Sequence, residues 1–261
     1  MLRDAATVLL VRDGTDGLEI YLLRRTRNMP FAGGMTAYPG GGVDPRDSET
    51  QLAWVGPPPA DWAGWFRTTE SLARALVCAA VRETFEEAGV LLAGPADGPV
   101  LSDVDTAEWE SVRQALLARE VSLAQALSAQ GLAIRADLLR PWAHWITPEP
   151  EPRRYDTRFF VAAVPAGQQA RHVTGEADEA SWLRPADALA EHEARTRTML
   201  PPTLLTLADL APHSTVDSAL AGAPPRPISP VLPRIEVDEE GPRVVTPDGT
   251  SVRLPRGFLR Q

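Results

Sequence analysis

One long helix in the first half of the chain constrains the fold more than any other feature. Its apolar residues are spaced by four, four and three positions, which places them on one side of a helix: Val77, Val81, Phe85 and Ala88. The periodicity begins near Ser71, and Gly89 is a natural end because glycine readily adopts the left-handed conformation that follows many helices. The pattern predicts a helix that buries one face against a core.

The other face of this helix is acidic. Glu83, Glu86 and Glu87 lie within one turn, where their carboxylates repel one another. Arg82 is four residues before Glu86 and is placed to hydrogen-bond it. The remaining negative charge favours a hard divalent cation such as magnesium, which prefers oxygen ligands. The alternative is a solvated acidic face, which is the usual meaning of a charge cluster.

A glycine-rich turn precedes the helix in the sequence. Gly40, Gly41 and Gly42 lack side chains, so their backbone amides are able to approach phosphate oxygens closely. Glycines that bind phosphate and carboxylates that bind magnesium occur together in phosphoanhydride chemistry, and this combination is the strongest functional signal from the residues.

The remaining elements predict one mixed α/β domain with a helical insertion. Apolar runs bounded by turn residues predict strands, and amphipathic runs predict helices. The expected strands are 5–11, 18–23, 142–147, 157–164 and 180–183, and the expected helices are 105–119, 122–130, a short one opened by Pro185, and 201–211. Residues 48–70 are expected to be mostly loop.

The last part of the chain is predicted to be an extension of this domain. Residues 1–215 are predicted to form the domain, and 216–261 a C-terminal extension. Its first part, 222–234, is rich in proline and should be extended, as a surface tail or linker. Short strands are expected at 243–246 and 251–254.

Composition excludes several classes of protein. The 26 basic and 35 acidic residues give a net charge of -9, which makes general nucleic-acid binding unfavourable. No apolar run approaches the length of a membrane span. The single cysteine, Cys78, excludes an internal disulfide and is expected to be a small buried hydrophobe. We expect a cytoplasmic protein without nucleic-acid or membrane partners.

The quoted motifs resemble the signature of the Nudix hydrolases. That signature has a glycine, five residues, a glutamate, seven residues, and then Arg-Glu-hydrophobic-any-Glu-Glu-any-Gly-hydrophobic. Gly41 matches the glycine, Asp47 stands at the first glutamate, and Arg82–Val90 matches the second half, with Thr84 at the hydrophobic position. The chain departs in two ways, because Asp47 is one methylene shorter than glutamate and 34 residues (48–81) separate it from Arg82.

The long insert resembles the subgroup typified by the peroxisomal coenzyme A diphosphatases. Leu22–Gly41, Ala79–Leu92 and Trp142–Ala163 are also similar to that subgroup. The resemblance implies a Nudix-type mixed sheet between helices, with an insertion inside the Nudix box and extra helices. It also implies hydrolysis of coenzyme A or acyl-coenzyme A, with magnesium or manganese, to 3',5'-ADP and the phosphopantetheine half.

Two alternatives to this function stay open. The first is another small nucleotide substrate, such as NADH, ADP-ribose or a nucleotide sugar. The second is a catalytically silent Nudix-fold module for binding or regulation. The intact carboxylate set argues against a silent module, because such a module has no need to keep mutually repelling glutamates.

The resemblance also assigns roles to single residues. Glu83, Glu86 and Glu87 would hold the metal ions, and Arg82 would orient Glu86. Glu83 is the first candidate for the general base. Glu176 and Glu179 are later candidates, for which a solvated acidic loop is the alternative.

Substrate binding is expected from the glycine turn and from nearby arginines. Besides Gly40, Gly41 and Gly42, the candidates are Arg27, Arg154 and Tyr155, because guanidinium groups pair with phosphate and a tyrosine ring stacks on a base. The alternative is that Arg154 or Arg158 pairs with Asp156.

The insertion 48–70 is rich in aromatic residues. Trp54, Trp62, Trp65 and Phe66 are too many for a free loop. We expect them to pack on the domain, to cap the substrate site or to form the interface of a homodimer.

Overall fold

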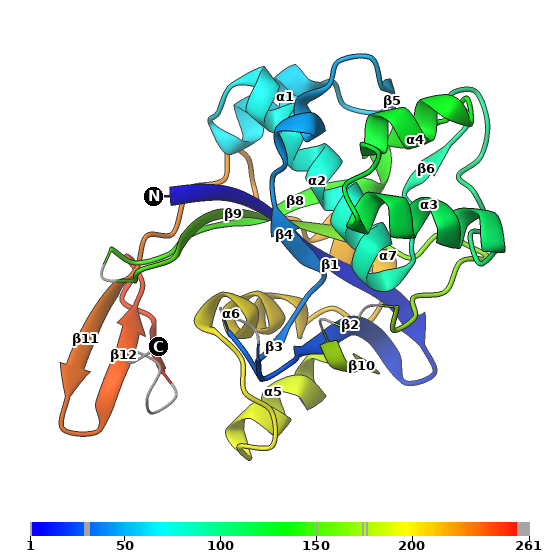
Figure 1. Ribbon diagram of the computed structural model, residues 1–261. Helices are drawn as coiled ribbons and strands as arrows, with labels where there is room; N and C mark the ends of the chain where they lie inside the picture. The colour runs from blue at the N-terminus through cyan, green and yellow to red at the C-terminus, as the bar shows by residue number, and fades with distance from the viewer. Residues whose placement is uncertain (1, 29–31, 150, 174, 176, 255–261) are drawn as a thin grey trace.

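A seven-stranded mixed sheet lies at the centre of the molecule (Figure 1). The structure, a computed structural model, describes residues 2–28, 32–149, 151–173, 175 and 177–254. The strand order is β10-β2-β1-β9-β8; only β1 and β9 are parallel along this path. These strands are β1 (Leu2–Gly14), β2 (Gly17–Arg25), β8 (Leu139–Ile146), β9 (Arg154–Ala163) and β10 (Ala177–Leu183).

Two short strands lie where β1 and β2 separate. β3 (Thr36–Ala37) pairs with β2, whereas β4 (Gly40–Gly42) pairs with β1. Tyr38 and Pro39 connect them, and the Pro39 carbonyl accepts a hydrogen bond of 2.9 Å from the Val8 amide. This short segment therefore joins the β2 side of the sheet to the β1 side.

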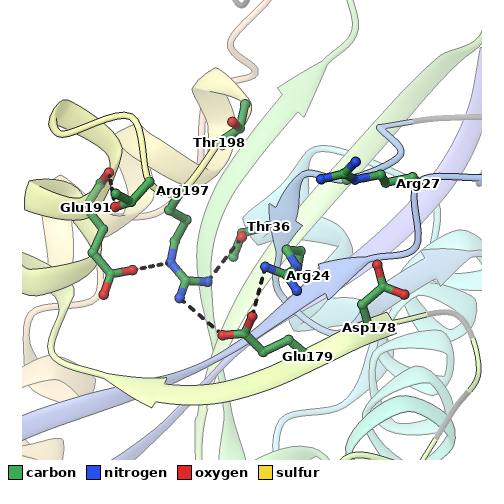
Figure 2. Close-up of a pocket in the computed structure, with 10 residues that line it drawn as sticks. Arg24, Arg27, Thr36, Asp178, Glu179, Glu191, Arg197 and Thr198 are labelled. Atoms are coloured by element: carbon green, nitrogen blue, oxygen red, sulfur yellow. Dashed lines mark hydrogen bonds and ion pairs between the residues drawn. The ribbon is translucent and has the colours of Figure 1, made fainter.

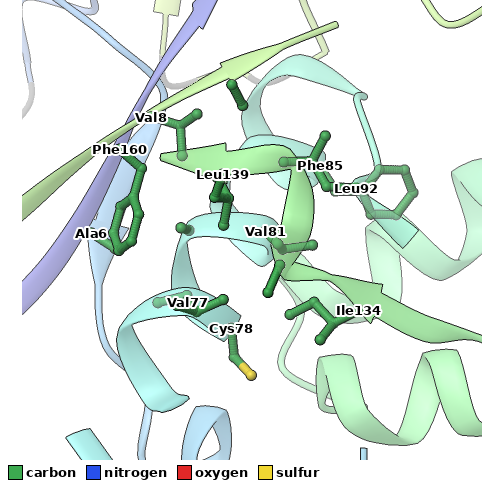
Figure 3. Packing of buried hydrophobic residues seen from close by; sticks show 14 of the residues in the cluster. Ala6, Val8, Val77, Cys78, Val81, Phe85, Leu92, Ile134, Leu139 and Phe160 are labelled. Carbon is green, nitrogen blue, oxygen red and sulfur yellow. The ribbon is translucent and has the colours of Figure 1, made fainter. Parts of the chain in front are cut away.

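Helices cover both faces of the sheet (Figure 1). Alternation along β1 sends Ala6, Val8 and Leu10 to one face and Leu9 and Val11 to the other, and both sets are buried. The first face packs against α1 (Pro59–Phe66) and α2 (Glu70–Ala88), as Figure 3 shows for α2. The second face carries α5 (Pro185–Glu193), α6 (Pro201–Leu210) and α7 (Val216–Ala221).

The long helix predicted from the sequence is α2, and both of its ends are as expected. The Thr69 hydroxyl accepts a hydrogen bond from the Leu72 amide at the start, and Gly89 follows the end with a φ of 68°. Cys78 is 2% exposed, and burial raises the pKa of its thiol to about 12. The prediction of a small buried hydrophobe is confirmed.

The insertion is more ordered than the sequence suggested. The expectation of mostly loop over 48–70 is wrong for the helix α1 and for β5 (Ala53–Val55), and η1 (Pro45–Ser48) directly precedes the insertion. Pro59 occupies the first position of α1, where its fixed φ favours a helix. Trp62 and Phe66, one turn apart, are 0% and 1% exposed and both contact Phe160 of the central sheet. The prediction that these aromatic residues pack on the domain is confirmed for this pair.

Further elements follow α2. The predicted helices are confirmed as α3 (Ala107–Leu117) and α4 (Leu123–Ala129), and η2 (Ala136–Leu138) leads into β8. A small sheet of order β5-β7-β6 was not predicted, because β6 (Ala93–Gly94) and β7 (Ala133–Arg135) are too short to show a pattern.

The C-terminal extension has a sheet of its own. It contains β11 (Arg234–Asp238), β12 (Gly241–Val245) and β13 (Ser251–Arg253), of which β11 was not predicted. The proline-rich segment before it is extended, but it lies against the domain and is no free tail. The Ile228 amide donates to the Trp65 carbonyl at 2.8 Å, and Val231 pairs with Trp145 of β8. Within the described part of the chain, no helix has the length and apolar character needed to cross a membrane.

Candidate active site

The carboxylate face of α2 lies directly against the glycine turn. The Gly40 amide donates a hydrogen bond of 2.8 Å to Glu87 Oε2. A Cβ atom at Gly41 would lie 2.5 Å from Glu83 Oε1, so any larger residue here would displace the Glu83 carboxylate. Glu83, Glu86 and Glu87 are 9%, 7% and 8% exposed, respectively. The two motifs that the sequence predicts to act together are therefore in contact.

Arg82 connects the turn to the helix. Its Nη1 atom donates to Glu83 Oε1 at 2.7 Å and to Glu86 Oε2 at 3.1 Å. Its Nη2 atom donates to the Gly42 carbonyl at 2.9 Å. The predicted hydrogen bond between Arg82 and Glu86 is confirmed, and the guanidinium also sets the distance between β4 and α2.

Asp47, which directly precedes the insertion in sequence, also pairs with the Arg82 guanidinium. Arg82 Nε lies 3.0 Å from Asp47 Oδ1, and Nη2 lies 2.9 Å from Oδ2, which is a two-point pairing. Asp47 is 4% exposed and also accepts the Asp44 amide at 2.8 Å. The long insertion therefore leaves the two halves of the motif in contact.

The cluster carries more negative than positive charge. Three nearly buried carboxylates contact the Arg82 guanidinium, and a fourth, Glu87, lies beside them and accepts the Gly40 amide. Burial, and next the neighbouring Glu83, raise the pKa of Glu86 to about 7. A site with this excess of negative charge and only oxygen donors is chemically suited to a hard divalent cation.

The glutamate oxygens do not yet point at a common centre. Among the described residues, no three carboxylate, imidazole or thiol groups are already arranged to hold a metal ion. One oxygen each of Glu83 and Glu86 is turned to Arg82, and one of Glu87 is turned to the Gly40 amide. The donor set fits magnesium, because all three side chains are carboxylates and each has a second oxygen besides the one named here.

Two residues that the sequence did not single out lie beside the carboxylates. Arg113 of α3 is 2% exposed, and its Nη1 atom donates to the Glu86 carbonyl at 2.9 Å near the end of α2. Tyr21 of β2 is 2% exposed, and its hydroxyl has no hydrogen-bond partner among the described residues. Burial, together with Glu87, holds the pKa of this phenol above its ordinary value, so it remains a donor.

Faint signals for both residues exist in the sequence. Arg113 lies on the apolar side of its helix with Trp109 and Leu116, a position unusual for a charge. Tyr21 alternates with Leu23 and Arg25 on the face of β2 that meets α2, and the Arg25 Nε atom is also buried without a partner among the described residues. Neither signal is specific enough to name a site residue.

A separate cavity of about 610 Å³ contains two other predicted residues, Arg27 and Glu179 (Figure 2). The Glu179 carboxylate lies 3.0 Å from Arg24 Nη1 and 3.9 Å from Arg197 Nη2. Glu176, the other late candidate for a base, lies outside the described residues.

The arginines in the first half of β9 mainly contact other groups of the protein. Arg158 is 4% exposed and pairs with Asp4 at 2.7 Å and with Asp156 at 2.9 Å, which confirms the alternative interpretation for this arginine. Arg154 Nε donates to the Thr147 carbonyl at 3.0 Å. Arg154 and Tyr155 begin β9 and are not part of the cavity lining. Their role in substrate binding stays a prediction.

A mixed sheet between helical layers, with a Glu-rich helix held against a glycine turn, defines the Nudix class of hydrolases. The family described as the NUDT19 Nudix domain matches residues 68–210, more than half of the chain, and the chain belongs to this Nudix family. The family expected from the sequence is thereby confirmed.

Individual relatives agree with this assignment. The chain is 26% identical over 268 residues to the acyl-coenzyme A diphosphatase NUDT19 of Gallus gallus, covering 82% of this chain and 69% of the relative. It is 22% identical over 250 residues to the protein of the same name from Xenopus laevis, covering 79% and 63%. The chain spans 60 to 69% of the length of the curated relatives it matches.

One solved structure has the same fold over most of its length. The crystal structure of a NUDIX hydrolase from Alicyclobacillus acidocaldarius aligns with a TM-score of 0.72 and 28% identity. The alignment covers 86% of this chain and 99% of the other. The Nudix-type fold predicted from the sequence is confirmed.

Proposed function

We propose that this protein hydrolyses the phosphoanhydride of coenzyme A or an acyl-coenzyme A. The products would be 3',5'-ADP and the phosphopantetheine half, with or without its acyl group. One observation carries the proposal: Arg82 holds the carboxylate helix and the glycine turn in contact across the long insertion. The names of the two NUDT19 relatives support the choice of substrate.

The residues proposed to hold magnesium or manganese are Glu83, Glu86 and Glu87. When bound, the metal supplies neutralisation of the diphosphate charge and a lower pKa for the attacking water. Arg82 would keep Glu83 and Glu86 fixed on α2 through hydrogen bonds of 2.7 and 3.1 Å.

Proton transfer needs a base near the scissile bond. We propose Glu83, which lies against Gly41 at the junction of helix and turn. Water would form a bond to one phosphorus, its proton would pass to the carboxylate, and the bond to the bridging oxygen would break. Glu179 is the weaker candidate, because it lines the separate cavity and not the carboxylate face of α2.

Two donors beside the cluster, one neutral and one on a charged guanidinium, are proposed to bind the diphosphate. The Tyr21 hydroxyl and the Arg25 Nε are buried without described partners, so a phosphate oxygen would satisfy them. The Gly40 amide and the Gly42 carbonyl are engaged with Glu87 and Arg82, so Gly40, Gly41 and Gly42 would act chiefly by permitting close approach.

A substrate panel tests the proposal. Coenzyme A, an acyl-coenzyme A, NADH, ADP-ribose and a nucleotide sugar are incubated with the enzyme and magnesium, and products are separated by chromatography. The highest kcat/KM is expected for coenzyme A or its thioester. A higher kcat/KM for another compound would show that coenzyme A is not the preferred substrate. If no compound is cleaved, the result would favour a catalytically silent module.

A further inference from the structure

The cavity in Figure 2 is built from elements on the β2 side of the sheet. Arg24 lies near the end of β2, Arg27 follows this strand, Thr36 lies in β3, and residues 196–198 lie between α5 and α6. Its volume of about 610 Å³ is within the range typical of small-molecule sites. None of its lining residues belongs to α2, so the cavity is distinct from the carboxylate cluster.

Three arginines give the cavity its chemical character. Figure 2 shows Arg24, Arg27 and Arg197 with their guanidinium groups directed toward its centre. Guanidinium groups bind phosphate through paired N–H donors, and the hydroxyls of Thr36 and Thr198 add further donors to the lining. The lining also holds three carboxylates, Asp178, Glu179 and Glu191, so a ligand phosphate depends on the guanidinium donors that these carboxylates do not use.

The arginines are held in place before any ligand binds. Arg197 is 10% exposed; its Nε donates to Glu191 at 2.7 Å and its Nη1 donates to the Thr36 hydroxyl at 3.2 Å. Glu179 lies between Arg24 and Arg197 and contacts both. The Thr36 amide donates to the Thr198 carbonyl at 2.8 Å, which ties the 196–198 segment to the sheet. Such ordering lowers the entropy cost of binding.

Arg27 differs from the other two arginines. It has no ion pair or hydrogen bond with any described residue, although it lines the same cavity as Glu179. Its guanidinium donors are therefore not used by any described residue, and a ligand phosphate would accept from them, with the Asp178 carboxylate in the same lining.

The cavity and the carboxylate cluster are joined by a short segment of chain. Thr36 lines the cavity and Gly40 touches Glu87, and only four residue steps separate them. Four steps span at most about 14 Å, so the backbones of Thr36 and Gly40 lie within the length of one nucleotide, with the cavity on the α5 and α6 face of the sheet and the cluster on the α2 face.

We infer that this cavity binds a phosphate monoester on the same substrate whose diphosphate is cleaved at α2. The inference rests on the proposed function, and in coenzyme A the group concerned is the 3'-phosphate of the ribose. Arg27, Arg197 and Arg24 bind this phosphate, and Glu179 holds two of the arginines apart. The cavity therefore selects substrates that carry the additional phosphate.

The test compares coenzyme A with dephospho-coenzyme A, which lacks only the 3'-phosphate. The ratio of their kcat/KM values is measured for the wild type, Arg27→Gln, Arg197→Gln and the control Arg184→Gln. Arg184 is an exposed arginine that pairs with Asp187 at the start of α5, away from the cavity lining. The ratio should favour coenzyme A in the wild type and in the control. It should fall by on the order of tenfold to a hundredfold in both cavity variants, as expected for lost charge-assisted hydrogen bonds.

If the enzyme or its variants do not hydrolyse the substrates at a measurable rate, a binding measurement tests the inference instead. Calorimetry compares adenosine 3',5'-bisphosphate with adenosine 5'-monophosphate, and the wild type should bind the bisphosphate more tightly, an advantage that Arg27→Gln reduces. Arg27 has no described partner, so this variant should fold normally even if Arg197→Gln does not. Equal affinities in the wild type, or an unchanged substrate ratio in Arg27→Gln, overturn the inference.

Two outcomes separate this inference from the proposed function. A wild type that cleaves neither coenzyme A nor its dephospho form, yet prefers the bisphosphate, overturns the proposed function and supports the cavity. Inorganic phosphate that binds without competing with the bisphosphate identifies an independent anion site, which overturns the inference.

Discussion

Arg82 and Asp47 form a two-point ion pair across 35 positions of sequence, with N···O distances of 3.0 and 2.9 Å. Asp47 is 4% exposed and the Arg82 side chain 12% exposed, so water does little to screen the pair. The short aspartate suffices here because η1 brings its backbone close to the guanidinium.

Removing the Asp47 carboxylate should therefore destabilise the protein. Asp47→Ala leaves a nearly buried guanidinium with fewer partners, which we expect to cost about 3 kcal/mol of the free energy of unfolding. Asp44→Ala, which removes a more exposed partner of Arg46, is the matched control and should cost less. Urea denaturation measures both, and equal losses would contradict a special role for the Asp47 pair.

Neutralising the proposed metal ligands should affect turnover and spare the fold. Glu86→Gln and Glu87→Gln each keep the size of the side chain, and we expect kcat to fall on the order of a hundredfold or more. The free energy of unfolding should stay equal or rise slightly, because like charges are removed. Glu70→Gln, at the exposed start of the same helix, is the control with unchanged kcat. A Glu87→Gln enzyme with the wild-type rate would remove Glu87 from the site.

Chelation should abolish activity. We expect excess EDTA to stop turnover and magnesium or manganese to restore it, because the cluster has oxygen donors and excess negative charge. Magnesium should also raise the Tm of the wild type more than that of Glu86→Gln. Full turnover in excess chelator would refute metal dependence.

The stability of the metal-free protein should fall as the pH rises from about 4.5 to 7. The pKa of Glu86 is raised to about 7 in the folded protein, so over this interval the folded state binds more protons than the unfolded chain. The contribution should be on the order of 1–3 kcal/mol. Urea denaturation in EDTA at several pH values should show this slope for the wild type and a smaller one for Glu86→Gln. Identical slopes would rule out Glu86 as the cause.

The insertion should contribute stability through its buried aromatic pair. Trp62→Ala removes a side chain that is 0% exposed and lies against Trp65 and Phe160, and we expect a loss of about 3–5 kcal/mol. Leu117→Ala, at a position 38% exposed, should cost far less. If the folded Trp62→Ala enzyme shows a raised KM for coenzyme A, the insertion also shapes the substrate site.

Much of this architecture could be predicted from local patterns in the sequence. The stripe from Val77 to Ala88 and the position of Gly89 predicted α2 closely, because a buried helical face and a left-handed end residue have distinct signals. Arg82 and its glutamates were found for the same reason, since their contacts are set by helical spacing.

Features that depend on tertiary contacts could not be predicted from the sequence. α1 was missed because Trp62 and Phe66 form an apolar pair whose helical conformation is decided by Phe160, far away in sequence. The contacts of Arg113 and Arg197 depend on how α3 and the 196–198 segment pack against the rest of the protein. Residue spacing along the sequence does not predict this packing. The cavity likewise depends on how β2, β3 and β10 meet.

The strap formed by residues 226–231 has a practical consequence for shortened versions of this protein. Val231 exchanges hydrogen bonds with the outer strand β8, through the His144 carbonyl and the Ile146 amide, and the Arg226 guanidinium lies 3.9 Å from the centre of the Trp65 ring. A chain cut at residue 210, where the family match ends, would leave β8 with unpaired amides and carbonyls and uncover Trp65. Bare strand edges of this kind pair with other chains, so such a fragment is expected to aggregate even though it keeps all the residues proposed for catalysis.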